Sequence, residues 1–87
     1  MKQANLLPQI RKIIQEVSVA ANHKKFTNTE NLYDKMILDS YHIVQLVVLL
    51  EERFRIVVDF QDLQNENFRS VKAIQQLLNE KYLDGKK

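Results

Sequence analysis

The sequence predicts an all-α fold in a single small domain. Only one of its 87 residues is Gly and one is Pro, whereas an all-β fold needs many special turns. Apolar residues recur at three- and four-residue steps along several stretches, which is the spacing of a helix with one buried face. Hydrophobic residues make up 45% and charged residues 28%, a balance typical of globular domains. We expect an ordered core over about residues 5–83 and a frayed tail over 84–87.

The first apolar stretch predicts a helix from about Leu6 to Ala20. Asn5 can serve as its N-cap, and Pro8 falls in the first turn, where its missing N–H costs little. Ser18 would lie inside this helix. The repeating apolar positions are Leu6, Leu7, Ile10, Ile13, Ile14 and Val17.

A long connection follows, from about Asn22 to Leu38. Its first residues are polar, and its later part carries spaced apolar residues that we expect to anchor it over the core. A connection of this length in so small a domain is often functional. The expected anchors are Phe26, Leu32, Met36, Ile37 and Leu38.

The second helix is predicted from Ser40 to about Phe54, with Asp39 or Ser40 as its cap. Its β-branched residues favour a strand, but a stretch this long without a turn signal favours a helix. One apolar stripe, the core face, consists of Ile43, Leu46, Val47, Leu50 and Phe54. A second stripe, Tyr41, Val44 and Val48, is flanked by Gln45 and Glu52. The pattern leaves open whether this second stripe is a partner surface or a margin of the core.

The rest of the chain predicts shorter elements. Arg55–Val58 reads as an extended link, and Asp59–Gln64 as one helical turn capped by Asp59. Ser70 can cap a last helix that reaches about Tyr82. Its inward residues would be Val71, Ile74, Leu77 and Leu78. The expected architecture is a bundle of three main helices and one short third helix, with a long loop between helices one and two.

Composition excludes several classes of function. The chain has no Cys and two His, so disulfides, thiolate metal sites and a Cys nucleophile are excluded and no metal is expected. The stretch Ile43–Leu50 is too short to span a bilayer, and the N-terminus lacks the apolar core of a signal peptide. We therefore expect a cytoplasmic monomer. The chain is also too small for an enzyme with an interdomain cleft, and it offers no acid–base pair.

The charge is unevenly distributed. The net charge of +2 and a pI of about 9.0 superficially suggest nucleic acid as a partner. However, residues 1–25 carry +4, residues 26–68 carry −5 and residues 69–87 carry +3. If the function lies in the middle, its partner should be basic. We expect a partner face of Tyr41, Val44, Gln45, Val48, Glu51 and Glu52, framed by the carboxylates of Asp39, Glu51, Glu52, Asp59 and Asp62.

Ser40 has two interpretations. As a residue at a helix start it can simply be a cap. A catalytic serine would need a base and an oxyanion site, but His42 lies on nearly the opposite side of the helix and no G-x-S-x-G elbow is present. A functional Ser40 would therefore be modified by another protein. A hydroxyl next to Asp39 at a helix N-terminus is well presented for this, and the helix dipole favours an attached phosphate.

The residues from Leu32 to Ser40, ending in Leu38-Asp39-Ser40, resemble the modification-site motif of acyl and peptidyl carrier proteins. Ile43–Val47 and Leu50–Phe54 resemble the rest of that family's second helix. Further similarity continues through Asp59, Leu63 and the run Glu66–Val71, so that the resemblance covers about Leu32 to Leu78.

The resemblance implies a four-helix carrier bundle and a freestanding carrier without catalytic activity. Ser40 would receive 4′-phosphopantetheine from coenzyme A through a phosphopantetheinyl transferase, with Asp39 as its motif neighbour. The thiol of the arm would hold an acyl, aminoacyl or peptidyl group as a thioester. Implied partners are a loading ligase and synthase or transferase enzymes of a biosynthetic pathway.

The chain also departs from this family. Met36 stands where Gly is usual, and Tyr41, His42 and Gln45 replace commoner residues. A less acidic second helix implies a dedicated carrier in a specialised pathway. Two alternatives are an interaction module in which Ser40 is only a cap, and a small DNA-binding helical domain. The second helix offers only Gln45 and Arg53 to base edges, which disfavours the DNA binder.

Overall fold

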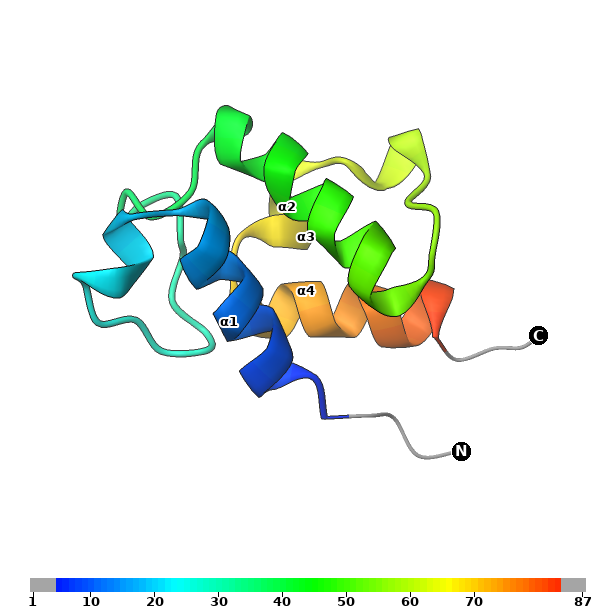
Figure 1. The fold of residues 1–87 in the computed structure, drawn as a ribbon, viewed down its shortest axis with the longest axis horizontal. Coiled ribbons are helices and arrows are strands. Elements are labelled where there is room, and N and C mark those ends of the chain that lie inside the picture. Colours follow the sequence, from blue (N-terminus) through cyan, green and yellow to red (C-terminus); the bar gives the residue numbers. More distant parts are fainter. Residues whose placement is uncertain (1–4, 84–87) are drawn as a thin grey trace.

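The computed structural model describes residues 5–83, whose helices pack around a shared core (Figure 1). Its helices are α1 (Leu7–Val17), α2 (Ser40–Phe54), α3 (Asn65–Phe68) and α4 (Val71–Leu77). Two 3₁₀ turns, η1 (Ala20–Asn22) and η2 (Phe60–Asp62), lie in the connections, and α4 continues into a π-helical turn, η3 (Leu78–Tyr82). No strand occurs within residues 5–83, so the predicted all-α class is confirmed. The predicted frayed tail lies outside the described residues.

Helix α1 follows the predicted apolar spacing but ends earlier. The expectation that Asn5 is the N-cap is wrong, because Leu6 holds that position without a side-chain cap; Asn5 Oδ1 accepts a hydrogen bond from Leu7 N at 3.3 Å, and Pro8 lies in the first turn. The prediction that Ser18 lies inside the helix is wrong, because Ser18 leaves the helical conformation and is the C-cap. Its buried hydroxyl donates to the carbonyl of Ile37 at 2.6 Å. Ser18 therefore links the end of α1 to the segment just before α2.

Helix α2 has the predicted bounds, and Asp39 is its cap. The helix ends because Arg55 adopts the left-handed conformation, with φ 57°. Arg55 is thus not part of an extended link, which begins one residue later. Leu46 and Leu50 are buried, as predicted for the core stripe, whereas Ile43, Val47 and Phe54 are half-buried against the core.

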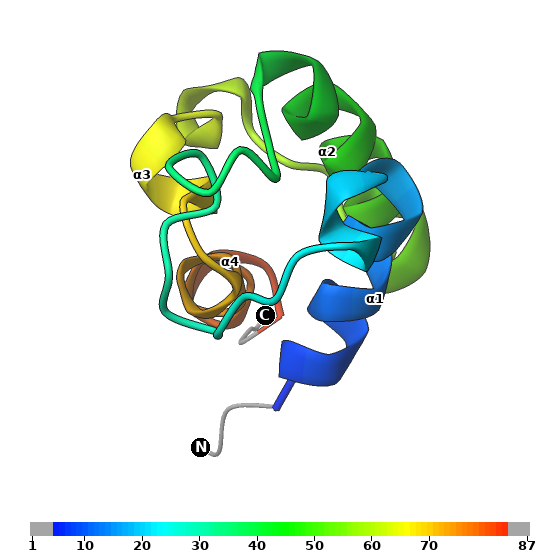
Figure 2. The same cartoon turned by 90° about the vertical axis from the view of Figure 1, so that its left-hand side faces the viewer.

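The connection between α1 and α2 covers one end of the bundle, passing α4 and α3 before it reaches α2 (Figure 2). Leu32 N donates to the carbonyl of Arg69 at 2.6 Å, and Lys72 N donates to that of Asn28 at 2.8 Å. Four of the five apolar residues predicted to anchor this connection are buried: Phe26, Leu32, Ile37 and Leu38. Met36 is the exception, because its side chain is 75% exposed.

The remaining elements close the bundle. Asp59 caps η2 by accepting from Gln61 N at 3.0 Å, and Ser70 caps α4 by accepting from Ala73 N at 3.0 Å, both as predicted. Helix α1 packs against α2 and α4, and an ion pair of 2.6 Å joins Glu16 to Arg53 of α2. Buried apolar residues from every α-helix and from the long connection form one core. The predicted inward residues of the last helix, Val71, Ile74, Leu77 and Leu78, belong to it.

Candidate functional site

The start of α2 is fixed by a reciprocal pair of hydrogen bonds. Asp39 Oδ1 accepts from the backbone N–H of His42 at 3.1 Å. His42 Nδ1 accepts in return from the backbone N–H of Asp39 at 3.3 Å. This is a capping box, with His in the position usually held by Glu or Gln. Because Asp39 performs the capping, the hydroxyl of Ser40 is not needed for it.

Ser40 is the first residue of α2, and its side chain is exposed. Within residues 5–83 its hydroxyl has no hydrogen-bond partner. The other two serines of the sequence are Ser18 and Ser70. Both are buried, and both hydroxyls are already bonded in the fold. Ser40 is therefore the serine that another protein can reach.

The backbone just before Ser40 is anchored in the core. Ile37 and Leu38 are buried, and their N–H groups both donate to the carbonyl of Leu32, at 2.9 Å and 3.2 Å. The carbonyl of Ile37 accepts from Ser18, as described above. The chain then emerges at Asp39 and Ser40, which are exposed. The buried, hydrogen-bonded residues before α2 thus fix the position of the exposed Ser40 hydroxyl.

Met36 occupies an unusual backbone conformation in this connection. Its φ is 59°, in the left-handed region that Gly adopts most readily. The carrier motif that the sequence resembles usually has Gly at this position, and the backbone here adopts a conformation that Gly permits although the residue is Met. A non-Gly residue costs about 1–2 kcal/mol in this conformation. The bond from Met36 N to the carbonyl of Tyr33 at 3.0 Å and the buried neighbour Ile37 help to hold it.

The second apolar stripe of α2 faces solvent. The exposed fractions of Tyr41, Val44 and Val48 are 68%, 65% and 47%. These residues are therefore not a buried part of the core. Gln45 Nε2 donates to the hydroxyl of Tyr41 at 3.1 Å, and Val44, Gln45 and Val48 line a groove shared with Val17 of α1. That the stripe contacts a partner stays a prediction.

The predicted acidic frame is mostly engaged within the fold. Glu51 is half-buried, and its Oε2 accepts from Val58 N at 2.9 Å. Asp39 and Asp59 cap their helices. Glu52 is exposed. Of the predicted acids, Glu52 has the side chain best placed to meet a partner.

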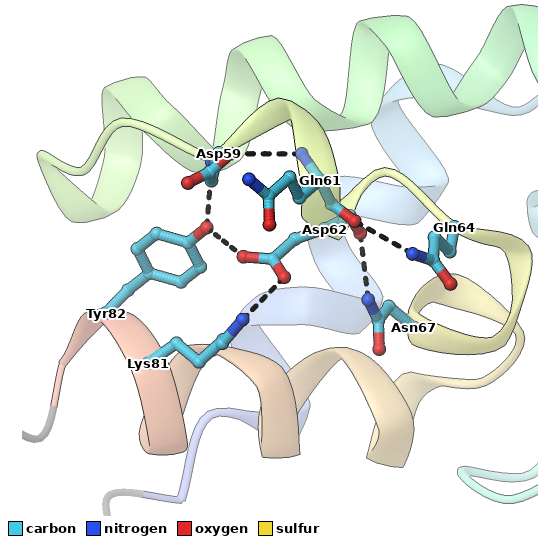
Figure 3. A network of polar contacts seen from close by, with 7 residues as sticks. All are labelled: Asp59, Gln61, Asp62, Gln64, Asn67, Lys81 and Tyr82. Carbon is cyan, nitrogen blue, oxygen red and sulfur yellow. Dashed lines mark hydrogen bonds and ion pairs between the residues drawn. The ribbon is translucent and has the colours of Figure 1, made fainter.

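The prediction that Asp62 frames this face is wrong, because Asp62, the last residue of η2, is buried and its carboxylate points towards η3 (Figure 3). Its Oδ1 accepts from Lys81 Nζ at 2.7 Å and its Oδ2 from the hydroxyl of Tyr82 at 2.5 Å. That hydroxyl also accepts from Asp59 N at 2.8 Å. These bonds lower the pKa of Asp62, and Lys81 is the main cause. Asp62 raises the pKa of Lys81 in return, while burial is the main cause of the raised pKa of Tyr82.

Asp62→Asn should destabilise the fold by about 1.5–3 kcal/mol at pH 7, because charged hydrogen bonds to Lys81 and Tyr82 are lost. The lowered pKa means that the native state favours the ionised carboxyl. The stabilisation of the fold by the ionised Asp62 carboxylate is therefore present at pH values above the pKa that Asp62 has in the unfolded chain. It is lost progressively as the pH falls below about 4. Urea denaturation at pH 7 and pH 3 should show the difference between the two proteins shrinking at pH 3. The exposed Glu66→Gln variant is the control, and an equal loss in both variants would contradict the role of the network.

Between residues 5 and 83 no helix is both long enough and apolar enough to cross a membrane. The same residues contain no cluster of three His, Cys, Asp or Glu that could hold a metal ion. Comparisons with protein-family models, with curated proteins and with solved structures each gave no match. The residues and their geometry therefore carry the functional argument.

The roles of two residues that shape the site, His42 and Ser18, were not predicted from the sequence. The signal for His42 was its position three residues after the cap, where a side chain can reach back to the cap N–H. Ser18 offered no local signal, because its partner Ile37 lies 19 residues further along the chain.

Proposed function

We propose that this chain is an acyl carrier protein, or an aminoacyl or peptidyl carrier, that is modified on Ser40. The observation that carries the proposal is the exposed hydroxyl of Ser40, which has no hydrogen-bond partner among residues 5–83 and lies at the start of a helix capped by its neighbour Asp39. In this proposal the bundle is a carrier bundle, in which the short third helix predicted at Asp59–Gln64 is the 3₁₀ turn η2, followed by α3, which was not predicted. The chain is a single carrier domain that acts in the cytoplasm in a specialised biosynthetic pathway.

The residues at Ser40 suit a 4′-phosphopantetheine group. A phosphodiester on this hydroxyl would lie at the N-terminus of a 15-residue helix, where the dipole stabilises an anion. When bound, the arm supplies a thiol that can hold a substrate as a thioester. The chain has no Cys to provide one itself. Its own residues hold and present the group, while a phosphopantetheinyl transferase, a loading ligase and synthase or transferase enzymes perform the chemistry.

The test is the intact mass of the protein after incubation with coenzyme A and a broad-specificity transferase. We expect one increment of a single phosphopantetheine group, and fragment masses that place it on Ser40. A known carrier domain in the same reaction shows that the transferase is active. An unchanged mass beside a fully modified control would overturn the proposal and favour the unmodified interaction module.

The exposed stripe of α2 supports a partner face for these enzymes. At 1.5 Å per residue, Val44 and Val48 lie about 6 Å and about 12 Å along the helix axis from Ser40. Tyr41, Val44 and Val48 are thus apolar contacts beside the modified residue. Gln45, Glu51 and Glu52 complete the face, with Glu52 as its available charge. A carrier visits several enzymes in turn, so such contacts should be modest in area and quick to release.

Val48→Asp should change the melting temperature by no more than a few degrees, because the side chain is 47% exposed. Transfer to or from a partner enzyme should slow by about tenfold, as expected when an apolar interface contact is lost. Val57→Asp is the matched control, since Val57 is 82% exposed but lies beyond the end of α2. Equal transfer rates for the two variants, or unfolding of Val48→Asp, would contradict this partner face.

A further inference from the structure

A groove of positive charge lies between α1 and the first part of the long connection. Arg11 contributes from α1, and Lys24, Lys25 and Lys35 contribute from the connection. Glu30 is the one acid among the lining residues. The groove therefore has more positive than negative charge, although residues 26–68 as a whole carry −5.

Arg11 is held in place within this groove. Its guanidinium lies 4.1 Å from the ring centroid of Phe26, and its Nη1 donates to Asn28 Oδ1 at 3.0 Å. The carbonyl of Asn28 in turn accepts from Lys72 N of α4. Arg11 has five N–H donors in a rigid fork, a geometry that suits carboxylates. Because it is already ordered, it loses little side-chain entropy when it binds an anion.

Of the four cations that line the groove, Lys35 is the one with an acidic partner among residues 5–83. Lys35 pairs with Glu30 at 3.5 Å, while the second oxygen of Glu30 accepts from Thr27 N at 2.8 Å. The ion pairs found within residues 5–83 involve neither Arg11, Lys24 nor Lys25. Lys24 Nζ donates instead to the backbone carbonyl of Lys35 at 2.9 Å, which places the Lys24 ammonium beside this part of the connection. An anion would find three positive side chains without an acidic partner in the described chain.

The groove lies near the end of the bundle at which α2 begins. Figure 2 shows η1, the long connection and the start of α2 on the side that faces the viewer. Lys35 precedes Ser40 by only five residues in the sequence. A protein that reaches Ser40 from this end would meet both the groove and the exposed stripe of α2.

We propose that this groove docks a short acidic segment of an enzyme that acts on Ser40; the inference rests on the proposed function. Charge complementarity supports this occupant. A nucleic acid is disfavoured because Glu30 lies in the groove and the exposed carboxylates of Asp34 and Asp39 follow in the sequence towards Ser40, where they would repel a continuing polyanion. The groove and the exposed carboxylate of Glu52 on α2 would then orient the enzyme by charges of opposite sign.

The test uses an isotope-labelled Ser40→Ala chain, so that binding does not depend on modification. NMR titration with a Glu- and Asp-rich peptide should shift the amides of Arg11, Phe26 and Thr27. Lys24→Gln with Lys25→Gln should weaken binding by about tenfold. Arg55→Gln with Arg69→Gln removes the same charge at exposed positions outside the groove, and should leave binding within about twofold. Arg11→Lys keeps the charge but loses the fork, and should weaken binding as well.

Three outcomes would overturn the inference. They are equal weakening in both double variants, peptide shifts located elsewhere, and tighter binding of a single-stranded oligonucleotide than of the peptide. A second readout is the rate of modification by the transferase, measured on chains that keep Ser40. There, Lys24→Gln with Lys25→Gln should lower kcat/KM and leave kcat unchanged. If Ser40 is never modified, the proposed function fails, but the peptide titration still decides whether the groove binds acidic segments.

Discussion

Replacing Ser40 with Ala is expected to abolish attachment of phosphopantetheine completely, while the chain keeps its fold. The loss should be complete because the hydroxyls of Ser18 and Ser70, the other two serines, are buried and bonded. The fold should persist because Asp39 caps α2. The change in stability should be smaller than the loss of a true cap, which costs about 1 kcal/mol. Intact mass reports the modification, and thermal unfolding reports the fold.

Ser70→Ala is the matched control for this experiment. It removes the cap of α4, so it should lower stability by about 1 kcal/mol and yet accept the full mass increment. The two serine variants thus separate loss of a cap from loss of the attachment atom. An increment that persists in the Ser40 variant would place the modification elsewhere and remove the basis of the proposed site.

Leu50→Ala should cause the largest loss of stability among the changes considered. Leu50 is 0% exposed and lies in the core between α2 and the rest of the bundle. Removing its side chain leaves a cavity, and such changes cost about 2–5 kcal/mol. A small domain has a total stability of only about 5–15 kcal/mol, so the variant should be partly unfolded under mild denaturing conditions. Urea denaturation followed by circular dichroism measures the effect.

Leu63→Ala provides the same chemical change at a position where 41% of the residue is exposed. We expect it to cost less than half as much as Leu50→Ala, since fewer contacts are lost and solvent can fill the space. Similar losses in the two variants would mean that Leu50 is not part of the tightly packed core.

Helices α1, α2 and α4 could be predicted because their signals are local, whereas the four-residue α3 was not predicted. The spacing of apolar residues gave the buried faces of α1, α2 and α4, and a capping residue lies at the predicted start of α2 and of α4. The position of Ser40 was predictable for the same reason, since it follows from a helix start and its neighbour Asp39. Its exposure and the absence of a partner for its hydroxyl within residues 5–83 needed the structure.

The features that were not predicted depend on distant residues or on the backbone conformation at a turn. Asp62 was assigned to an exposed face, but its partners Lys81 and Tyr82 lie 19 and 20 residues away in the sequence. Met36 was expected to be buried because it is apolar, yet the backbone turns there in the left-handed region and leaves the side chain in solvent. Composition and periodicity carry no information about such pairings or turns.

The links between the long connection and α4 have a consequence for synthesis of the chain on the ribosome. Leu32 is held by the carbonyl of Arg69, and Asn28 by Lys72 N, so the segment that precedes Ser40 is anchored by residues translated more than thirty positions later. Leu6 N likewise donates to Gln75 Oε1, across a separation of 69 residues. Contacts so distant in sequence form late, because the ends of long loops must first be brought together. A nascent chain therefore exposes Ser40 well before the surrounding site acquires its final form.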